Sequence, residues 1–183
     1  MADELLPDFT ETQLTTELVY DGQLLKVRAD TVRLPDGRTA SREYVRHPGA
    51  VIIIPLLDDR TVNMERQYRY PMRRQFHELP AGKIEPGEAA LSTAQRELVE
   101  ECGYRAGVWQ HLATLHPCIG YSDERFELYL ARELTQVDQS LDDGEFLEVI
   151  PMAIDEVWRQ IRDGRITDVK VLAGMSWLRS LLD

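Results

Sequence analysis

Residues 82–104 read Gly-Lys-Ile-Glu-Pro-Gly-Glu-Ala-Ala-Leu-Ser-Thr-Ala-Gln-Arg-Glu-Leu-Val-Glu-Glu-Cys-Gly-Tyr. The part from Glu88 to Cys102 contains no glycine or proline and is rich in alanine, leucine, glutamate and arginine. Apolar side chains recur in it at a spacing of four residues, at Ala90, Ala94 and Leu98. This spacing predicts an amphipathic helix, and Gly103 is expected to end it.

The same helix carries three carboxylates on one face. Glu97 and Glu101 are four residues apart and Glu100 is three residues from Glu97, so the three side chains are neighbours that repel one another. A solvated acidic face is the ordinary explanation for a glutamate-rich helix. A bound divalent cation is the other explanation, because Mg²⁺ prefers oxygen ligands. Arg96 is placed to hold the carboxylates, and the preceding turn brings the Ala81 carbonyl near the helix as a further ligand.

The stretch resembles the Nudix box, Gly-x5-Glu-x7-Arg-Glu-(apolar)-x-Glu-Glu-x-Gly-(apolar). All fixed positions of that motif are present, as Gly82, Glu88, Arg96, Glu97, Glu100, Glu101 and Gly103. The resemblance implies an α/β fold, the Nudix α/β/α sandwich. It also implies Mg²⁺-dependent hydrolysis of a nucleoside diphosphate linked to another group, with Mn²⁺ as the alternative ion.

The resemblance further implies what each residue of the box does. Glu97, Glu101 and the Ala81 carbonyl are the expected metal ligands. Glu100 is expected to take part in catalysis as a further or second-metal ligand. The residues expected to support the loop and the helix, rather than to react, are Gly82, Glu88, Arg96 and Gly103.

Outside the box, the chain resembles the ADP-ribose pyrophosphatase branch of this family. That branch reads Gln-x-Arg and then Glu-Leu-Pro-Ala-Gly-Lys, which here are residues 67–69 and 78–83. Segments 34–37, 42–51, 120–124 and 143–145 are similar as well. In this branch the N-terminal strands form a small antiparallel sheet that two subunits exchange, so the resemblance implies a homodimer. The residues expected to contact a small-molecule nucleotide sugar are Leu24, Arg42, Glu43, Arg46, Arg69, Lys83, Ile119, Gly120 and Glu124.

Hydrolysis also needs a base that takes a proton from the attacking water. The candidates lie in the acidic loop at residues 142–145, and they are Glu145 and, as its rival, Asp143. In the branch that this chain resembles, the loop supplies both a base and an extra metal ligand. Glu145 is therefore a candidate metal ligand too, and the two roles stay unassigned. A solvated turn is the alternative explanation of the loop.

One segment departs from the pattern of ADP-sugar hydrolases. These enzymes usually carry a proline in a Ser-Pro-Gly-like turn shortly past the box, where this chain has Cys118-Ile119-Gly120. Hydrolysis of another nucleotide sugar, such as GDP-mannose or ADP-glucose, therefore stays open. A nucleotide-sensing module without turnover and a nucleoside triphosphate hydrolase are further alternatives.

Composition excludes several other classes of protein. The 183 residues include 21 Lys+Arg and 32 Asp+Glu, which gives a formal net charge of −11 and argues against a nucleic-acid partner. The apolar stretch at residues 50–57 is too short to cross a membrane. The acidic N-terminus lacks the apolar region of a signal peptide, and two cysteines give no disulfide framework. We therefore expect a cytoplasmic protein.

The pattern along the chain predicts three parts. Residues 1–13 are expected to be flexible, residues 14–48 to form β-strands for dimerisation and substrate contact, and residues 49–183 to form the hydrolase domain. Within that domain, the continuous apolar run from Val51 to Ile54 predicts a strand buried on both faces. Later strands are expected at 108–115, 126–131 and 147–150, and two closing helices at 154–162 and 169–182.

Overall fold

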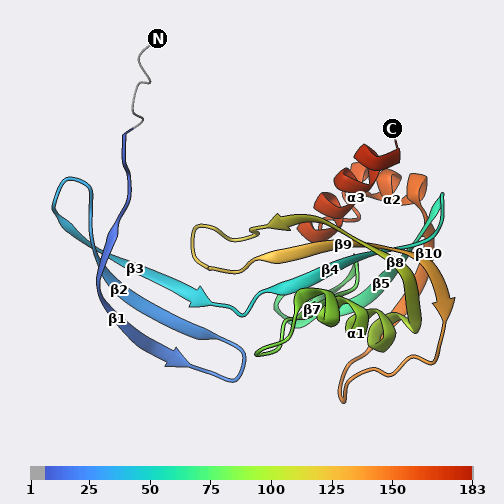
Figure 1. Ribbon diagram of the computed structural model, residues 1–183, viewed down its shortest axis with the longest axis horizontal. Helices are drawn as coiled ribbons and strands as arrows, with labels where there is room; N and C mark the ends of the chain where they lie inside the picture. Colours follow the sequence, from blue (N-terminus) through green and yellow to red (C-terminus); the bar gives the residue numbers. More distant parts are fainter. Residues whose placement is uncertain (1–6, 183) are drawn as a thin grey trace, which may run out of the picture. The chain divides into compact units, whose positions relative to one another are not determined.

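The computed structural model describes residues 7–182, which form two compact units (Figure 1). The first unit extends to His47 and includes residues 118–124, and the second comprises residues 48–117 and those from Arg125 onward. Residues 1–6 of the segment predicted to be flexible lie outside the described residues. Strand β1 begins at Thr12, inside that predicted segment, and the Gln13 amide is held by a 2.9 Å hydrogen bond to the Asp30 carboxylate.

The first unit is an antiparallel sheet with the strand order β1-β2-β3. Its strands are β1 (Thr12–Asp21), β2 (Lys26–Arg33) and β3 (Thr39–Arg46). Gly37, with a φ of 86°, makes the tight turn between β2 and β3. Residues 118–124 attach to β3, because the Val45 N–H donates a 2.9 Å hydrogen bond to the Tyr121 carbonyl. The prediction of an antiparallel N-terminal sheet is thus confirmed.

The second unit contains a mixed seven-stranded sheet with the order β10-β5-β4-β9-β8, extended by β6 beside β5 and by β7 beside β4. Strands β4 and β9 run parallel, and the other pairs run antiparallel. The strands are β4 (Ala50–Asp58), β5 (Thr61–Arg69), β6 (Arg74–Glu78), β7 (Ala81–Lys83), β8 (Tyr104–Leu115), β9 (Phe126–Gln136) and β10 (Leu147–Ala153). A short 3-10 turn, Tyr70–Met72, joins β5 to β6.

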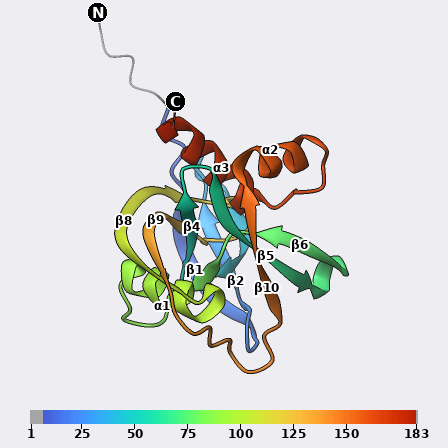
Figure 2. The ribbon, with the colours of Figure 1, turned by 90° about the vertical axis from the view of Figure 1, so that its right-hand side faces the viewer.

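Helices cover both faces of this sheet (Figures 1 and 2). Helix α1 (Ala90–Cys102) lies on one face, and α2 (Ile154–Arg162) and α3 (Val169–Leu182) lie on the other. The central strand β4 alternates between them: Val51 and Ile53 pack with the α1 core, whereas Ile52 and Ile54 pack with the α3 core. All four side chains are fully buried, so the predicted α/β/α sandwich around a doubly buried strand is confirmed. No helix within residues 7–182 is long and apolar enough to cross a membrane.

The structure differs from the expected elements at the segment that precedes α1. The sequence analysis assigned no strand to residues 71–87, yet this segment contains β6 and β7, which pair with β5 and β4. Helix α1 begins at Ala90 rather than at Glu88. Glu88 lies in the preceding loop, where its carboxylate accepts hydrogen bonds from Arg96 and from the Thr93 hydroxyl.

Candidate active site

Arg96 holds the carboxylates of α1 and of the preceding loop together. Its Nη1 donates to Glu97 at 2.8 Å and to Glu100 at 2.9 Å, while its Nε and Nη2 each reach Glu88 at 3.1 Å. Hydrogen bonds from Arg96 are the main reason that the pKa of Glu88 falls to about 2. One guanidinium therefore connects three acidic side chains of the motif, an arrangement that suits a supporting residue.

The Glu101 side chain contacts the short strand β7. Its side chain is almost fully buried, and its Oε2 accepts a 3.0 Å hydrogen bond from the Ala81 N–H. Ala81 faces Ile52 of β4, and the Ile53 N–H donates to the carbonyl of Pro80, the residue before Ala81. Because hydrogen-bonded pairs alternate along an antiparallel ladder, both the N–H and the C=O of Ala81 point away from β4. The Ala81 carbonyl therefore projects from the same edge of β7 on which Glu101 lies.

Gly82 explains how α1 can pack so closely against β7. A Cβ atom at this position would lie 1.8 Å from Oε1 and 1.9 Å from Cδ of Glu97, so no larger residue fits without displacing that side chain. Glu97 thus rests on the backbone of β7 beside Ala81. The requirement for glycine here is a close approach of two elements rather than an unusual φ angle.

These groups offer the oxygen donors that a hard divalent cation prefers. Glu97, Glu101 and the Ala81 carbonyl surround the junction of β7 and α1. Within residues 7–182, no three His, Cys, Asp or Glu side chains already converge on one point. Glu97 and Glu100 each bind Arg96 through one carboxylate oxygen, Oε1 of Glu97 and Oε2 of Glu100, which leaves the second oxygen of each for an ion.

The electrostatics of the site also favour a cation. Burial raises the pKa of Glu101, and the negative charges of Glu65, Glu97 and Glu145 raise it further. Burial is likewise the main reason that the pKa of Glu97 is raised. Several carboxylates therefore share a poorly solvated region where their charges are not balanced, and a divalent ion would supply that balance.

Glu65 is a member of this cluster that the sequence analysis missed. It lies on β5, is almost fully buried, and accepts a 3.3 Å hydrogen bond from the Cys102 thiol at the end of α1. Burial raises the pKa of Glu65, with smaller contributions from the charges of Glu145 and Glu78. The available signal was an acidic residue directly after Met64, at the end of the buried part of β5.

The acidic loop before β10 places its two candidate bases differently. Glu145 is half-buried, and the Gln67 amide approaches its Oε1 at 3.4 Å. The charge of Glu145 also contributes to the raised pKa of Glu97 and of Glu101, so this carboxylate lies within electrostatic range of both. Asp143 is exposed, and within residues 7–182 no hydrogen bond or ion pair holds it. This geometry favours Glu145 over Asp143.

The predicted substrate contacts divide between the two units. In the second unit, the Arg69 guanidinium is bound by Glu78, and exposed Lys83 ends β7. In the first unit, Arg42 pairs with Glu11, Arg46 lies 3.1 Å from Asp123, and Glu124 lies 3.5 Å from His47. The remaining predicted contacts of the first unit are Leu24, Glu43, Ile119 and Gly120, which are all exposed.

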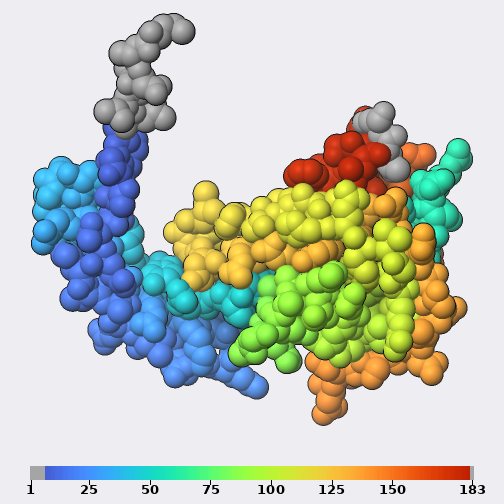
Figure 3. Space-filling view, in the orientation of Figure 1, coloured from blue at the N-terminus to red at the C-terminus, as the bar shows by residue number. Residues whose placement is uncertain are grey.

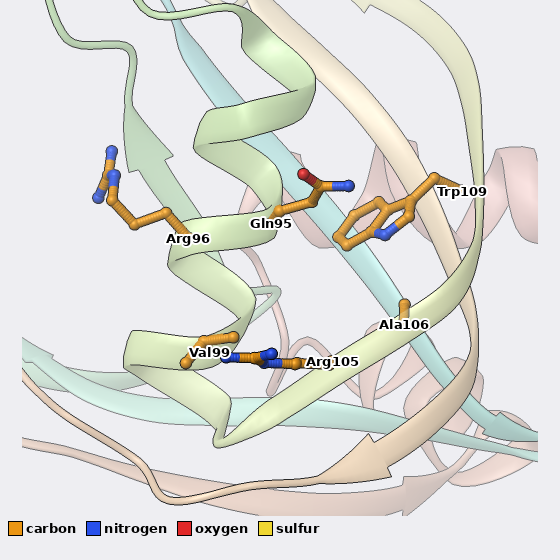
Figure 4. Close-up of a pocket in the computed structure, with 6 residues that line it drawn as sticks. All are labelled: Gln95, Arg96, Val99, Arg105, Ala106 and Trp109. Atoms are coloured by element: carbon orange, nitrogen blue, oxygen red, sulfur yellow. The ribbon is translucent and has the colours of Figure 1, made fainter.

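A cavity of about 340 Å³ lies on another side of α1, against β8 (Figure 4). Its lining residues are Gln95, Arg96, Val99, Arg105, Ala106 and Trp109. In Figure 4 the Gln95 amide points toward the Trp109 ring, whereas the Arg96 guanidinium points away from it. The acidic partners of Arg96 therefore lie outside this cavity. Figure 3 shows α1 and the start of β8 together on an exposed face of the second unit.

Comparison with known proteins agrees with this geometry. A family model described as the NUDIX domain matches residues 46–174, and one described as the nucleoside diphosphate sugar hydrolase N-terminal domain matches residues 11–45. A crystal structure of an ADP compounds hydrolase superposes with a TM-score of 0.86 over 96% of each chain, at 23% identity, which supports the fold.

Two curated relatives cover nearly the whole chain. The methanol dehydrogenase activator of Bacillus methanolicus is 38% identical over 173 residues, which are 93% of this chain and 94% of the relative. The ADP-ribose pyrophosphatase of Bacillus subtilis is 32% identical over 171 residues, which are 92% of each. On the evidence of the motif, the sandwich fold and these matches, the chain belongs to the Nudix family.

Proposed function

We propose that this chain hydrolyses the pyrophosphate bond of ADP-ribose in the presence of Mg²⁺, giving AMP and ribose 5-phosphate. The observation that carries the proposal is the set of oxygen donors at the junction of β7 and α1, formed by Glu97, Glu101 and the Ala81 carbonyl. The match of residues 11–45 to an N-terminal domain of nucleoside diphosphate sugar hydrolases supports the substrate class. Similarity to an ADP-ribose pyrophosphatase supports this particular substrate.

A bound Mg²⁺ would neutralise the diphosphate and lower the pKa of a coordinated water. Glu97, Glu101 and the Ala81 carbonyl would hold the ion, with Glu100 as a further ligand. Arg96 fixes these carboxylates before the ion arrives. Glu145 would then accept the proton of the attacking water. Because the formal net charge of the chain is −11, local cations matter more for binding the substrate than long-range attraction does.

We infer in addition that the chain forms a homodimer through its N-terminal sheet. Every residue of β1 is exposed in the single chain, including the apolar residues Leu14, Leu18, Val19 and Tyr20. A sheet of three strands covers little of its own apolar surface, and contiguous exposed apolar surface marks an interaction site. A second copy of this chain would cover it and bring Arg42, Glu43 and Arg46 to the partner's substrate.

The substrate assignment is tested by the products formed from ADP-ribose, GDP-mannose and ADP-glucose, each incubated separately with Mg²⁺ and with EDTA. We expect AMP to appear fastest from ADP-ribose, and only when the metal is present. Faster cleavage of another nucleotide sugar would move the assignment to that compound and implicate the loop at Cys118-Ile119-Gly120. Binding of ADP-ribose without turnover would contradict the proposed activity and favour a sensing module.

The dimer is tested by placing a charge on the exposed strand. Leu18→Lys is expected to shift the molar mass measured by light scattering from twice 21.1 kDa toward a single chain, and to lower activity. Leu18 is exposed within the single chain, so the substitution leaves the fold of the monomer intact. Thr135→Lys adds the same charge at an exposed residue of β9 in the second unit and serves as the control. A Leu18→Lys variant that stays dimeric would contradict this interface.

A further inference from the structure

Four charged side chains form a connected ion network between β5, β6 and the start of α3. Arg69 donates through Nε and Nη2 to the two carboxylate oxygens of Glu78, at 2.6 and 2.7 Å. Lys170 Nζ donates to Glu78 at 2.9 Å and lies 3.0 Å from Asp168. The side chains of Glu78, Lys170 and Asp168 are only 4%, 15% and 14% exposed, so the network lies largely inside the protein.

The bond to Glu78 leaves one edge of the Arg69 guanidinium free. A guanidinium has five N–H donors in a rigid plane, and Glu78 uses two of them. The Arg69 side chain is 45% exposed, so its remaining donors are accessible to a phosphate oxygen. The hydrogen bonds to Glu78 raise the pKa of Arg69 most, and the charge of Glu101 adds to that effect. Arg69 is therefore within electrostatic range of a candidate metal ligand.

Lys170 determines how Glu78 is held. Burial alone would raise the pKa of Glu78, but hydrogen bonds from Arg69 and the charge of Lys170 bring the pKa below its ordinary value. Glu78 Oε2 accepts hydrogen bonds from both Arg69 Nη2 and Lys170 Nζ, so removal of Lys170 takes away one of the two cations that fix the direction of this buried carboxylate. Asp168 in turn fixes Lys170, because it also accepts the Lys170 backbone N–H at 3.3 Å in the first turn of α3.

We propose that Lys170 and Asp168 are positioning residues for diphosphate binding, which act through Glu78 to aim the free edge of Arg69 at the substrate. The inference rests on the proposed function for the identity of the ligand. It adds to the site two residues at the start of α3, the helix on the face of the sheet opposite α1. A cavity of about 390 Å³ beside Arg69, Glu78 and Lys170 gives water access to this network.

The test compares wild type, Lys170→Met and Lys170→Arg by calorimetric titration with ADP and by the kinetics of ADP-ribose hydrolysis. Arg69 would bind the diphosphate in the ground state and the transition state alike, so its misplacement should act on affinity. We expect Lys170→Met to raise the Kd of ADP and the KM of ADP-ribose about tenfold with a smaller change in kcat, because a charge-assisted hydrogen bond is weakened. Lys170→Arg should restore most of the affinity.

A double-mutant cycle separates positioning from general structural damage. In an Arg69→Met background, Lys170→Met should have no further effect on the Kd of ADP, because the residue through which it acts is gone. An equal effect in both backgrounds would overturn the proposal. Arg159→Met is the matched control, since it removes a cation from an exposed ion network on α2. Asp168→Asn, of nearly the same size, is the second variant if Lys170→Met does not fold, and it should raise the Kd about threefold.

The outcomes also separate this inference from the proposed function. Wild type that hydrolyses ADP-ribose, combined with an unchanged Kd in Lys170→Met, overturns the positioning alone. Wild type that binds ADP without hydrolysing ADP-ribose, combined with the tenfold loss in Lys170→Met, overturns the hydrolase and supports the positioning. Wild type that neither binds ADP nor hydrolyses ADP-ribose overturns both.

Discussion

Glu101→Gln is expected to lower the kcat/KM of Mg²⁺-dependent ADP-ribose hydrolysis by at least about 100-fold, while the protein stays folded. Substitution of groups that merely orient a metal ligand costs about 10–100-fold, and Glu101 is expected to contact the ion directly. Glutamine keeps an oxygen that can accept the 3.0 Å hydrogen bond from the Ala81 N–H, so the packing of α1 against β7 should survive. Only the ligand charge is lost.

Thermal unfolding in EDTA checks that this loss is not caused by misfolding. Burial raises the pKa of Glu101 above its ordinary value of 4.5, so the folded metal-free protein binds a proton that the unfolded chain releases. The stability of the wild type should therefore fall as pH rises above about 4.5. Glu101→Gln lacks this titration, so its Tm in EDTA should equal or exceed that of wild type, increasingly so at higher pH. Mg²⁺ should stabilise wild type more than the variant.

Glu133→Gln is the matched control, because Glu133 is an exposed carboxylate on β9 that is not among the hydrogen-bond partners of Arg96. It should leave both activity and Tm unchanged. Activity of Glu101→Gln within a few-fold of wild type would remove Glu101 from the metal site. A Tm in EDTA far below that of wild type would instead assign it a structural function.

Local sequence patterns account for the elements that were predicted correctly. Ala94 and Leu98 are four residues apart within one helix, so their spacing alone predicts that they share a face. The structure buries both side chains in the core that α1 covers. The unbroken apolar run at residues 51–54 likewise reports burial on both faces of a single strand. The two closing helices were predicted with the bounds that the structure has, 154–162 and 169–182. In each case the signal lies within the element.

Contacts between distant segments explain what could not be predicted. Strand β7 is only three residues long and forms through its pairing with β4. A segment of that length is too short to show the alternation that predicts a strand. Glu65 joins the acidic cluster through the Cys102 thiol, 37 residues further along the chain. Lys170 reaches Glu78 across 92 residues. The resemblance to the Nudix box predicted Glu97, Glu101 and the Ala81 carbonyl as ligands, and this assignment stays a prediction that the geometry favours.

Gly82→Ala is expected to lower activity about 10–100-fold and to destabilise the protein by about 1–3 kcal/mol. The added methyl group would overlap the Glu97 carboxylate, whose Cδ lies 1.9 Å from the ideal Cβ position. Glu97 cannot simply swing away, because Arg96 holds it at 2.8 Å within the set of three carboxylates. Relief therefore requires that α1 separates from β7 or that the Arg96 network rearranges, and either change displaces metal ligands. Steady-state kinetics and chemical denaturation measure the two effects.

Gly107→Ala provides a matched control within the same unit. A Cβ at Gly107 would also meet a glutamate, at 2.8 Å from Oε2 of Glu133, which is exposed and can turn into solvent, and at 3.2 Å from its Cβ, which must give by a few tenths of an ångström. The control should therefore keep wild-type activity and lose less stability than Gly82→Ala. Adding Glu97→Asp to Gly82→Ala shortens the side chain that the new methyl group meets, so the stability should recover. Activity should stay low, because the shorter carboxylate no longer reaches the proposed metal site beside Ala81. A Gly82→Ala variant as active and stable as wild type would contradict the close packing of Glu97 against β7, and with it the position of the proposed metal site.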